Sequence, residues 1–364
     1  NSWTIGNQLV SGFYPNRIPN PDLKWEKTGQ FDIGFDLGLF NNRLRLTADY
    51  YYKKTTDLLY NVAIPSASGY DSMLKNIGSV QNKGYELSIE SDNLSGAFSW
   101  TTAFNISFNR NKVLELGGET YKDVGTYDDH LKTSDIRRLI VGQPIGVFYG
   151  YRFDGIFQNE AECAQQTSSP SPIGVGLRRY KDLNGDGKID ATNDREILGD
   201  ANPKFFGGMT NTFAYKGFEL NVFLQYSYGN KIFNYNAMEL ESPTGGQNVY
   251  QDLVNRWTPT NPSNEYQKAT TNRNNIVSDR FIEDGSFLKL KTVSLSYSFP
   301  KLNWKHIGGL RLYVTGQNLL TWTKYRGYDP EVSYRGASTL EAGEDFGGYP
   351  QARTFMFGIK LDIK

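Results

Sequence analysis

The residues with the clearest chemical potential form one short acidic stretch, DLNGDGKID, at residues 182–190. Its oxygen-bearing side chains stand at alternate positions, as Asp182, Asn184 and Asp186, and Gly187 follows them. Hard oxygens at the first, third and fifth positions of a loop converge on a calcium ion, and a glycine at the sixth permits the sharp turn. The spacing therefore predicts the first half of an EF-hand-type calcium loop.

The second half of this loop departs from the calcium-binding pattern. The twelfth position is Asn193, and Asp194 follows one residue late. Because no bidentate Glu closes the loop, we expect weak binding, or a bulge that brings Asp194 into place. The alternative is a metal-free loop, since runs of Asp, Asn and Gly form Asx turns without an ion. The predicted ligands of a structural Ca²⁺, with Lys188 offering its backbone carbonyl, are Asp182, Asn184, Asp186, Lys188, Asp190 and Asp194.

No motif of a catalytic centre accompanies this loop. The two histidines, His130 and His306, stand outside any HExxH pattern, and the sequence has no GxSxG, no P-loop and no glycine fingerprint that opens a helix. The carboxylates of Asp128, Asp129 and Glu241 are expected in solvated loops. The sequence therefore predicts a protein that is not an enzyme, with a barrel enzyme as the weakest alternative.

The elements that must position these residues are β-strands. Residues 31–39 alternate apolar residues with Asp and Gly, and residues 44–53 alternate apolar residues with charged or polar ones. Strict alternation places each set on its own face of a strand, and Asn41-Asn42 supplies the turn of a hairpin. One face is apolar and ends in tyrosines while the other carries charge, as in a strand between lipid and a watery lumen.

The same pattern recurs along the chain. Further hairpins are predicted over about 85–108, 205–233 and 293–314, followed by a strand over 355–363. Short turns alternate with long connections, as in outer-membrane barrels, where short turns are periplasmic and long loops are extracellular. This alternation gives about nine membrane-crossing strands, with the C-terminus on the periplasmic side.

The long connections are expected to carry little regular structure. Residues 1–28 and 60–83 are predicted to be loops, residues 149–157 an extracellular extension, and residues 250–257 a short helix. Aromatic rings in such loops suit sugar rings or peptide side chains, or else they pack the loops together. The aromatic residues considered for these roles are Tyr250, Trp257, Tyr325, Tyr328 and Tyr334.

Composition narrows the classes of protein and partner. The chain has 364 residues, and its 39 Lys and Arg equal its 39 Asp and Glu, so no net field attracts nucleic acid. No apolar run is long enough for a transmembrane helix, although alternating strands could still cross a membrane. The single Cys163 rules out an internal disulfide. A soluble secreted β-sandwich or propeller with one wet face per strand is the alternative architecture.

Several segments in a fixed order carry a resemblance to a known family. They are NPDLKWEKTGQFDIGFDLGLFNNRLRLTADYYYKKTTDLL, then IGSVQNKGYELSIE, then the group YKDLNGDGKID, NDREILGD and ANPKFFGG, and finally YPQARTFMFGIKLDI. Over essentially the whole chain they resemble the C-terminal part of the SusC/RagA-like TonB-dependent outer-membrane transporters. The resemblance implies an all-β fold in which about nine antiparallel strands belong to a transmembrane barrel of 22 strands. Residues 1–364 would then lie within one barrel domain, with the plug, the TonB box and the first strands upstream.

The resemblance also implies active import of an oligosaccharide or a peptide. In that family a SusD-like surface lipoprotein delivers the solute, the TonB–ExbB–ExbD system moves the plug, and the solute enters the periplasm. We therefore expect a barrel in the bacterial outer membrane, surrounded by lipid, with a calcium-ordered loop on which the lipoprotein docks. The residues that bind the solute are not predicted. A secreted calcium-dependent carbohydrate-binding or adhesion β-protein is the alternative from a different class.

Overall fold

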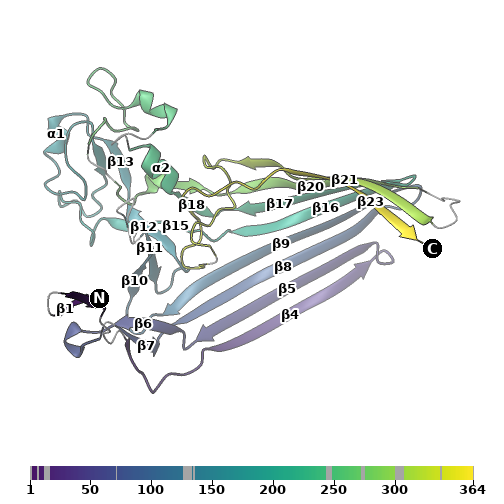
Figure 1. The fold of residues 1–364 in the computed structure, drawn as a ribbon, viewed down its shortest axis with the longest axis horizontal. Coiled ribbons are helices and arrows are strands. Elements are labelled where there is room, and N and C mark those ends of the chain that lie inside the picture. The colour runs from purple at the N-terminus through teal and green to yellow at the C-terminus, as the bar shows by residue number, and fades with distance from the viewer. Residues whose placement is uncertain are drawn as a thin grey trace.

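The central element of the computed structural model is one antiparallel sheet of nine strands, seen in Figure 1. The structure describes residues 2–5, 8–11, 17–70, 72–125, 133, 136–242, 248–271, 275–299, 307–336 and 338–363. The strands of the sheet, here called the wall, are β4 (Lys27–Leu39), β5 (Leu44–Thr56), β8 (Ser79–Leu94), β9 (Phe98–Glu115), β16 (Phe205–Tyr215), β17 (Phe218–Tyr228), β20 (Phe287–Ser298), β21 (Ile307–Thr323) and β23 (Thr354–Ile363). Their order across the wall is their order along the chain, which confirms the predicted antiparallel strands.

Tight turns join β4 to β5, β8 to β9 and β16 to β17 at one end of the wall, and long segments connect its strands at the other (Figure 1). The first turn places Asn41 and Asn42 in the left-handed region, with φ of 58° and 62°. Lys216 and Gly217 do the same in the predicted turn between β16 and β17. Asn and Gly accept this backbone conformation at low energetic cost, so the sequence located both turns.

The N-terminal region and the connection between β5 and β8 contain more strand than the sequence predicted. Here β1 (Ser2–Ile5) pairs with β2 (Gln8–Ser11), while β3 (Arg17–Ile18), β6 (Leu59–Ala63) and β7 (Ser72–Asn76) form a second small sheet beside the short helix η1 (Ser66–Ser68). The prediction of loops over 1–28 and 60–83 is therefore wrong. These strands have two to five residues, which is too few for alternation to reveal them.

The described residues of the remaining long segments fold together into a loop assembly, defined by the described residues within 116–204, 229–286 and 324–353. One of its sheets has four strands, β10 (Tyr121–Val124), β11 (Arg137–Ile140), β12 (Val147–Tyr151) and β15 (Arg195–Gly199). A second sheet pairs β13 (Phe153–Ile156) with β14 (Arg178–Tyr180). A third sheet combines β18 (Lys231–Asn234), β19 (Ile282–Asp284) and β22 (Glu344–Asp345). Residues 149–157 thus lie outside the wall, as predicted.

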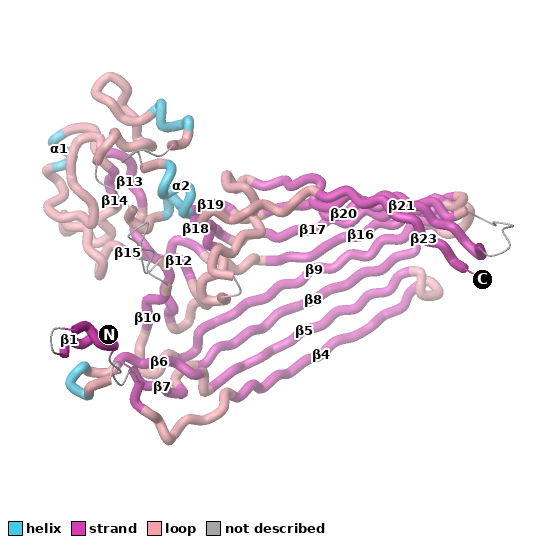
Figure 2. Tube along the Cα trace, in the orientation of Figure 1, coloured by secondary structure: helices cyan, strands magenta, loops and turns pink. Residues whose placement is uncertain are grey.

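Within the described residues, every helix lies at the end of the wall that carries the long segments, as Figure 2 shows in cyan. The helices of the loop assembly are α1 (Glu160–Cys163), α2 (Tyr235–Leu240), η2 (Gln251–Asn255) and η3 (Asp279–Phe281). The 3₁₀-helix η2 lies within the short helix predicted over 250–257. Among the described residues, no helix combines the length and apolar character needed to span a membrane.

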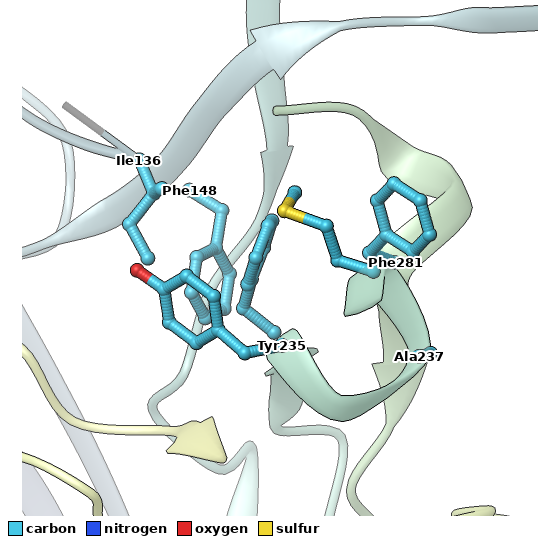
Figure 3. Packing of buried hydrophobic residues seen from close by; sticks show 7 residues of the cluster. Ile136, Phe148, Tyr235, Ala237 and Phe281 are labelled. Atoms are coloured by element: carbon cyan, nitrogen blue, oxygen red, sulfur yellow. The ribbon is translucent and has the colours of Figure 1, made fainter. Parts of the chain in front are cut away.

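The main hydrophobic core lies in the loop assembly rather than against the wall (Figure 3). Its side chains come from four separate stretches and are at most 2% exposed; they are Ile136, Phe148, Phe233, Tyr235, Ala237, Met238 and Phe281. Phe233 meets Tyr235 edge to face, with ring centroids 4.8 Å apart. The loop assembly is therefore a packed unit with its own core, which can hold functional side chains in fixed positions.

Candidate functional site

The wall presents one continuous apolar face. Rings on different strands meet across it: Phe218 of β17 lies 4.5 Å from Tyr297 of the neighbouring β20, and Phe104 of β9 lies 6.2 Å from Tyr226 of β17, on the other side of β16, between ring centroids. The edge strands leave their apolar residues uncovered, and Phe357 is 82% exposed. A water-soluble monomer rarely exposes an apolar surface of this extent, whereas a strand that borders lipid requires it.

The opposite face of the wall is polar and is partly covered by the segment between β21 and β23. Lys289 is directly opposite Gln225 on β17. The next pair, Leu288 and Tyr226, lies on the apolar face, so Lys289 and Gln225 lie on the polar one. The Lys289 ammonium lies 2.6 Å from both Asp329 Oδ1 and Glu331 Oε2, and it is 2% exposed. The connecting segment is thus fixed against the polar face of the wall.

This charged cluster is well compensated. Burial alone would raise the pKa of Asp329, but hydrogen bonds from Lys289 Nζ and the Glu331 N–H hold that pKa below its ordinary value. Burial would also raise the pKa of Glu331, but hydrogen bonds from Lys289 and Lys291 hold it below its ordinary value. The Glu331 carboxylate lies 3.0 Å from Lys291 Nζ. Both carboxylates therefore favour the charged form that binds Lys289.

The predicted calcium loop is closed by hydrogen bonds between its own carboxylates and backbone N–H groups. Asp182 accepts from the N–H of Gly185 at 2.6 Å and from that of Gly187 at 2.7 Å. The fully buried Asp194 accepts from the N–H groups of Leu183 and Asp190, both at 2.8 Å. Asp194 therefore joins the two halves of the loop, which is the position that the sequence left in question.

The remaining predicted ligands cap short local turns. Asn184 accepts from the Asp186 N–H, and Asp186 accepts from the Lys188 N–H at 2.8 Å. Hydrogen bonds from Asn193 and Thr192 lower the pKa of Asp190, which keeps its carboxylate charged. These are the Asx turns that the metal-free alternative expects.

The loop is compatible with a cation without being arranged around one. Across the described residues, no group of three or more His, Cys, Asp or Glu is placed to hold a metal ion. A carboxylate oxygen has two lone pairs, so a bond from one backbone N–H leaves it able to bind a cation. Calcium at Asp182, Asn184, Asp186, Lys188, Asp190 and Asp194 therefore stays a prediction.

The loop assembly contains buried ion pairs that the sequence did not reveal. Arg137 Nε lies 3.0 Å from Glu344 Oε1, and their side chains are 1% and 2% exposed. Burial lowers the pKa of Arg137 and raises that of Glu344, while each partner opposes the shift of the other. The two residues are 207 positions apart and carry no local signal, so only the fold brings them together.

Glu241 is a second buried charge, and its predicted place in a solvated loop is wrong. It is 2% exposed and lies 2.8 Å from Arg280 and 3.1 Å from Arg326, which also binds Glu283 at 2.9 Å. Arginines from distant segments compensate its charge, which explains why it can be buried. The other residues considered for catalysis, Asp128, Asp129, His130 and His306, lie outside the described residues.

Most of the loop aromatics pack the assembly together. Tyr250 packs against the main core, Trp257 donates from Nε1 to Gln158 at 3.1 Å, and the buried Tyr325 donates to Asp345. Tyr334 meets Phe346 edge to face at 5.3 Å.

Tyr328 differs, because it is 79% exposed on a segment held at both sides. Arg326 anchors one side through Glu241, and Asp329 anchors the other through Lys289. Tyr328 is therefore held in place by its neighbours while its own ring stays open to solvent.

Comparison with known proteins agrees with this architecture. A family model described as TonB dependent receptor-like, beta-barrel, matches residues 2–160. TonB-dependent receptor P3 of Formosa agariphila is 41% identical, over 98% of this chain and 36% of that protein. TonB-dependent receptor SusC of Bacteroides thetaiotaomicron is 29% identical, over 99% of this chain and 34% of SusC. The solved structure of the RagAB peptide transporter matches with a TM-score of 0.78 at 26% identity, over 98% of this chain and 37% of the matched chain.

The chain thus spans about a third of the length of the curated relatives it matches. Those relatives are TonB-dependent receptors and the matched structure is that of a transporter, which confirms the prediction that this is not an enzyme. The fold of this chain, with its nine-stranded wall, is similar to that of the matched transporter chain over 98% of the residues of this chain. The chain therefore belongs to the TonB-dependent receptors of the SusC/RagA-like kind, and its wall is the C-terminal portion of their β-barrel.

Proposed function

We propose that the intact protein is an outer-membrane importer that takes up an oligosaccharide or a peptide with energy from the TonB–ExbB–ExbD system. The observation that carries this proposal is the wall itself, with one exposed apolar face and one polar face, in a chain similar to SusC and RagAB. TonB-dependent receptors are outer-membrane barrels, so the apolar face borders lipid and the polar face borders the lumen. Strands and a plug outside residues 1–364 complete the barrel of 22 strands.

The loop assembly faces the cell exterior in this proposal and receives a SusD-like surface lipoprotein. Its own core and buried ion pairs give it the rigidity that a docking surface requires. Short turns and the C-terminus lie on the periplasmic side. The solute passes along the polar face, where Tyr328 projects from its anchored segment.

A growth experiment tests the proposed transport. We expect deletion of the gene in its host to abolish growth on one class of oligosaccharide or peptide as sole carbon source, with recovery from the intact gene only when TonB is present. Tyr328→Ala should slow uptake by about two- to tenfold, the loss of one aromatic contact, whereas Tyr328→Phe should retain it. Growth on every tested solute without the gene, or uptake without TonB, would contradict the proposal.

We also propose a structural role for the calcium loop, in which a bound Ca²⁺ orders residues 182–194 for lipoprotein docking. Extracellular calcium is plentiful, so a weak site of this kind can stay occupied. We expect Asp186→Ala to increase proteolysis of this loop and to weaken lipoprotein co-purification while leaving barrel assembly intact. Chelation of calcium should reproduce the effect in the wild type and add nothing in the variant. Equal loop protection with and without calcium would leave the metal-free Asx loop as the explanation.

A further inference from the structure

The acidic loop at residues 182–194 contains the only Asn-Gly pair in the sequence, Asn184-Gly185. Both residues are exposed to solvent. The backbone nitrogen of a glycine is the least shielded in a chain, because glycine has no Cβ. The carboxamide carbon of the preceding asparagine is an electrophile within reach of that nitrogen. The pair therefore has the two groups that a side chain and the backbone need to close a ring.

The nucleophile of this pair, the Gly185 nitrogen, is bound to a carboxylate. The Gly185 N–H donates to Asp182 Oδ1 at 2.6 Å, and the Gly187 N–H holds the second oxygen of the same carboxylate at 2.7 Å. Asp182 is thus fixed within the hydrogen-bond distance that a proton acceptor requires. The same hydrogen bond increases the electron density on the Gly185 nitrogen.

The electrophile, the carboxamide of Asn184, is held by Asp186. Asn184 Oδ1 accepts from the Asp186 N–H at 3.1 Å, and Asn184 Nδ2 donates to Asp186 Oδ2 at 3.1 Å. These bonds keep the carboxamide beside the backbone. An N–H that points at a carbonyl oxygen also stabilises the negative charge that develops there when a nucleophile adds to the carbonyl carbon. The electrophile is therefore both positioned and activated.

The surroundings of Gly185 leave room for a ring, whereas those of the next asparagine in the loop do not. Gly185 has φ of 76°, and a Cβ placed on it would meet no heavy atom within 4 Å. Asn193 is also exposed, but the residue after it, Asp194, is fully buried. The Asp194 N–H donates to the Asp190 carbonyl at 3.2 Å, which keeps that nitrogen engaged. Asn193 is therefore a matched control within the same loop.

We propose that Asn184 is a site of spontaneous deamidation in the folded protein. Asp182 takes the proton from the Gly185 nitrogen, and this nitrogen forms a bond to Asn184 Cγ. The bond between Cγ and Nδ2 breaks, and ammonia leaves with that proton. Water then adds to either carbonyl of the resulting succinimide, and opening of the ring gives aspartate or isoaspartate at residue 184. Water is the only co-reactant, and it reaches the exposed loop directly.

Conversion at residue 184 changes the charge and the shape of the loop. Each product adds one negative charge beside Asp182 and Asp186, which already repel each other. Isoaspartate also lengthens the main chain by one methylene, which displaces the Asp186 N–H from its acceptor. The reaction requires neither calcium nor transport, so failure of either proposal above leaves this inference unaffected.

Peptide mapping of the intact protein in neutral detergent, incubated at neutral pH, tests the site. We expect isoaspartate and aspartate to accumulate together at residue 184, at least about tenfold faster than at Asn193. Isoaspartyl methyltransferase, which methylates isoaspartate but not aspartate, identifies the first product. Asn184→Gln retains a carboxamide but requires a larger ring, so it should abolish the isoaspartate.

A pair of variants tests the part that Asp182 plays. Asp182→Asn should slow the conversion at least about fivefold, because it removes the proton acceptor. The control Asp190→Asn removes the same charge from the same loop, but Asp190 accepts from the N–H groups of Thr192 and Asn193, so the rate should stay unchanged.

Three results would overturn the inference or one of its steps. No conversion at residue 184, or equal conversion at Asn184 and Asn193, would overturn the site. Aspartate without isoaspartate would mean that water attacks the side chain directly, which would overturn the ring closure. An equal change of rate in Asp182→Asn and Asp190→Asn would exclude Asp182 as the proton acceptor.

Discussion

Glu344→Ala should destabilise the loop assembly by about 3–5 kcal/mol, because it leaves the buried guanidinium of Arg137 without its carboxylate. Arg137 also stacks over the Phe148 ring, with its Cζ 4.2 Å from the ring centroid. An uncompensated charge would therefore stand directly against the main core. Hydrogen exchange of the intact protein should show faster exchange in β11, β12 and β18 while the wall strands keep their protection.

Two control variants separate this buried pair from ordinary surface charge. Glu90→Ala removes a carboxylate 3.0 Å from Arg45 on the wall, but both partners are solvent-exposed, so the expected loss is at most about 1 kcal/mol. Arg137→Met/Glu344→Leu removes both buried charges and should recover most of the lost stability. An effect of Glu344→Ala no larger than that of Glu90→Ala would show that the pair is not energetically important.

Phe104→Arg should destabilise the intact barrel by about 2–4 kcal/mol in a lipid bilayer, and its neighbour Asn105→Arg should do so by much less. Phe104 pairs with Ile89 and Met209 near the middle of the apolar face. An arginine there must enter the hydrocarbon region. Asn105 points to the polar face, where the variant loses a hydrogen bond to the Gly208 N–H, a loss of about 1 kcal/mol.

Reversible unfolding of the intact protein in lipid vesicles, monitored by tryptophan fluorescence, would give both free energies. Equal destabilisation by the two substitutions would mean that the two faces of β9 meet similar surroundings. That result would favour the secreted β-protein over the membrane barrel.

The wall could be predicted from sequence because apolar and polar residues alternate repeatedly along each of its strands. Alternation over strands of 10 to 18 residues fixes both the face and the register, and Asn41-Asn42 and Lys216-Gly217 fix two of the turns. Even the assignment of residues 149–157 to an extension followed from the alternation of short turns and long connections. These features depend on neighbours in the sequence, so they are visible there.

The loop assembly could not be predicted in the same way, since it depends on contacts between distant segments. Strands such as β18 and β22 are short and pair across more than 100 residues, and Glu241 is buried only because Arg280 and Arg326 reach it. For residues 182–194 the sequence predicted a calcium loop, with metal-free Asx turns as the alternative, and the structure added the role of Asp194 as the residue that closes the loop. Binding of Ca²⁺ to this loop depends on the affinity of the site, which the spacing of the residues does not determine.

The central claim is that the alternating faces of the wall separate lipid from a watery lumen, and cysteine labelling along β9 tests it most directly. In the intact protein, with the buried Cys163 replaced by Ser, single cysteines would stand at Ala103, Phe104, Asn105 and Ile106. After reconstitution into vesicles, a membrane-impermeant maleimide should label Ala103→Cys and Asn105→Cys and leave Phe104→Cys and Ile106→Cys unmodified. Labelling of all four positions alike, or preferential labelling of Phe104→Cys and Ile106→Cys, would contradict a membrane-embedded wall.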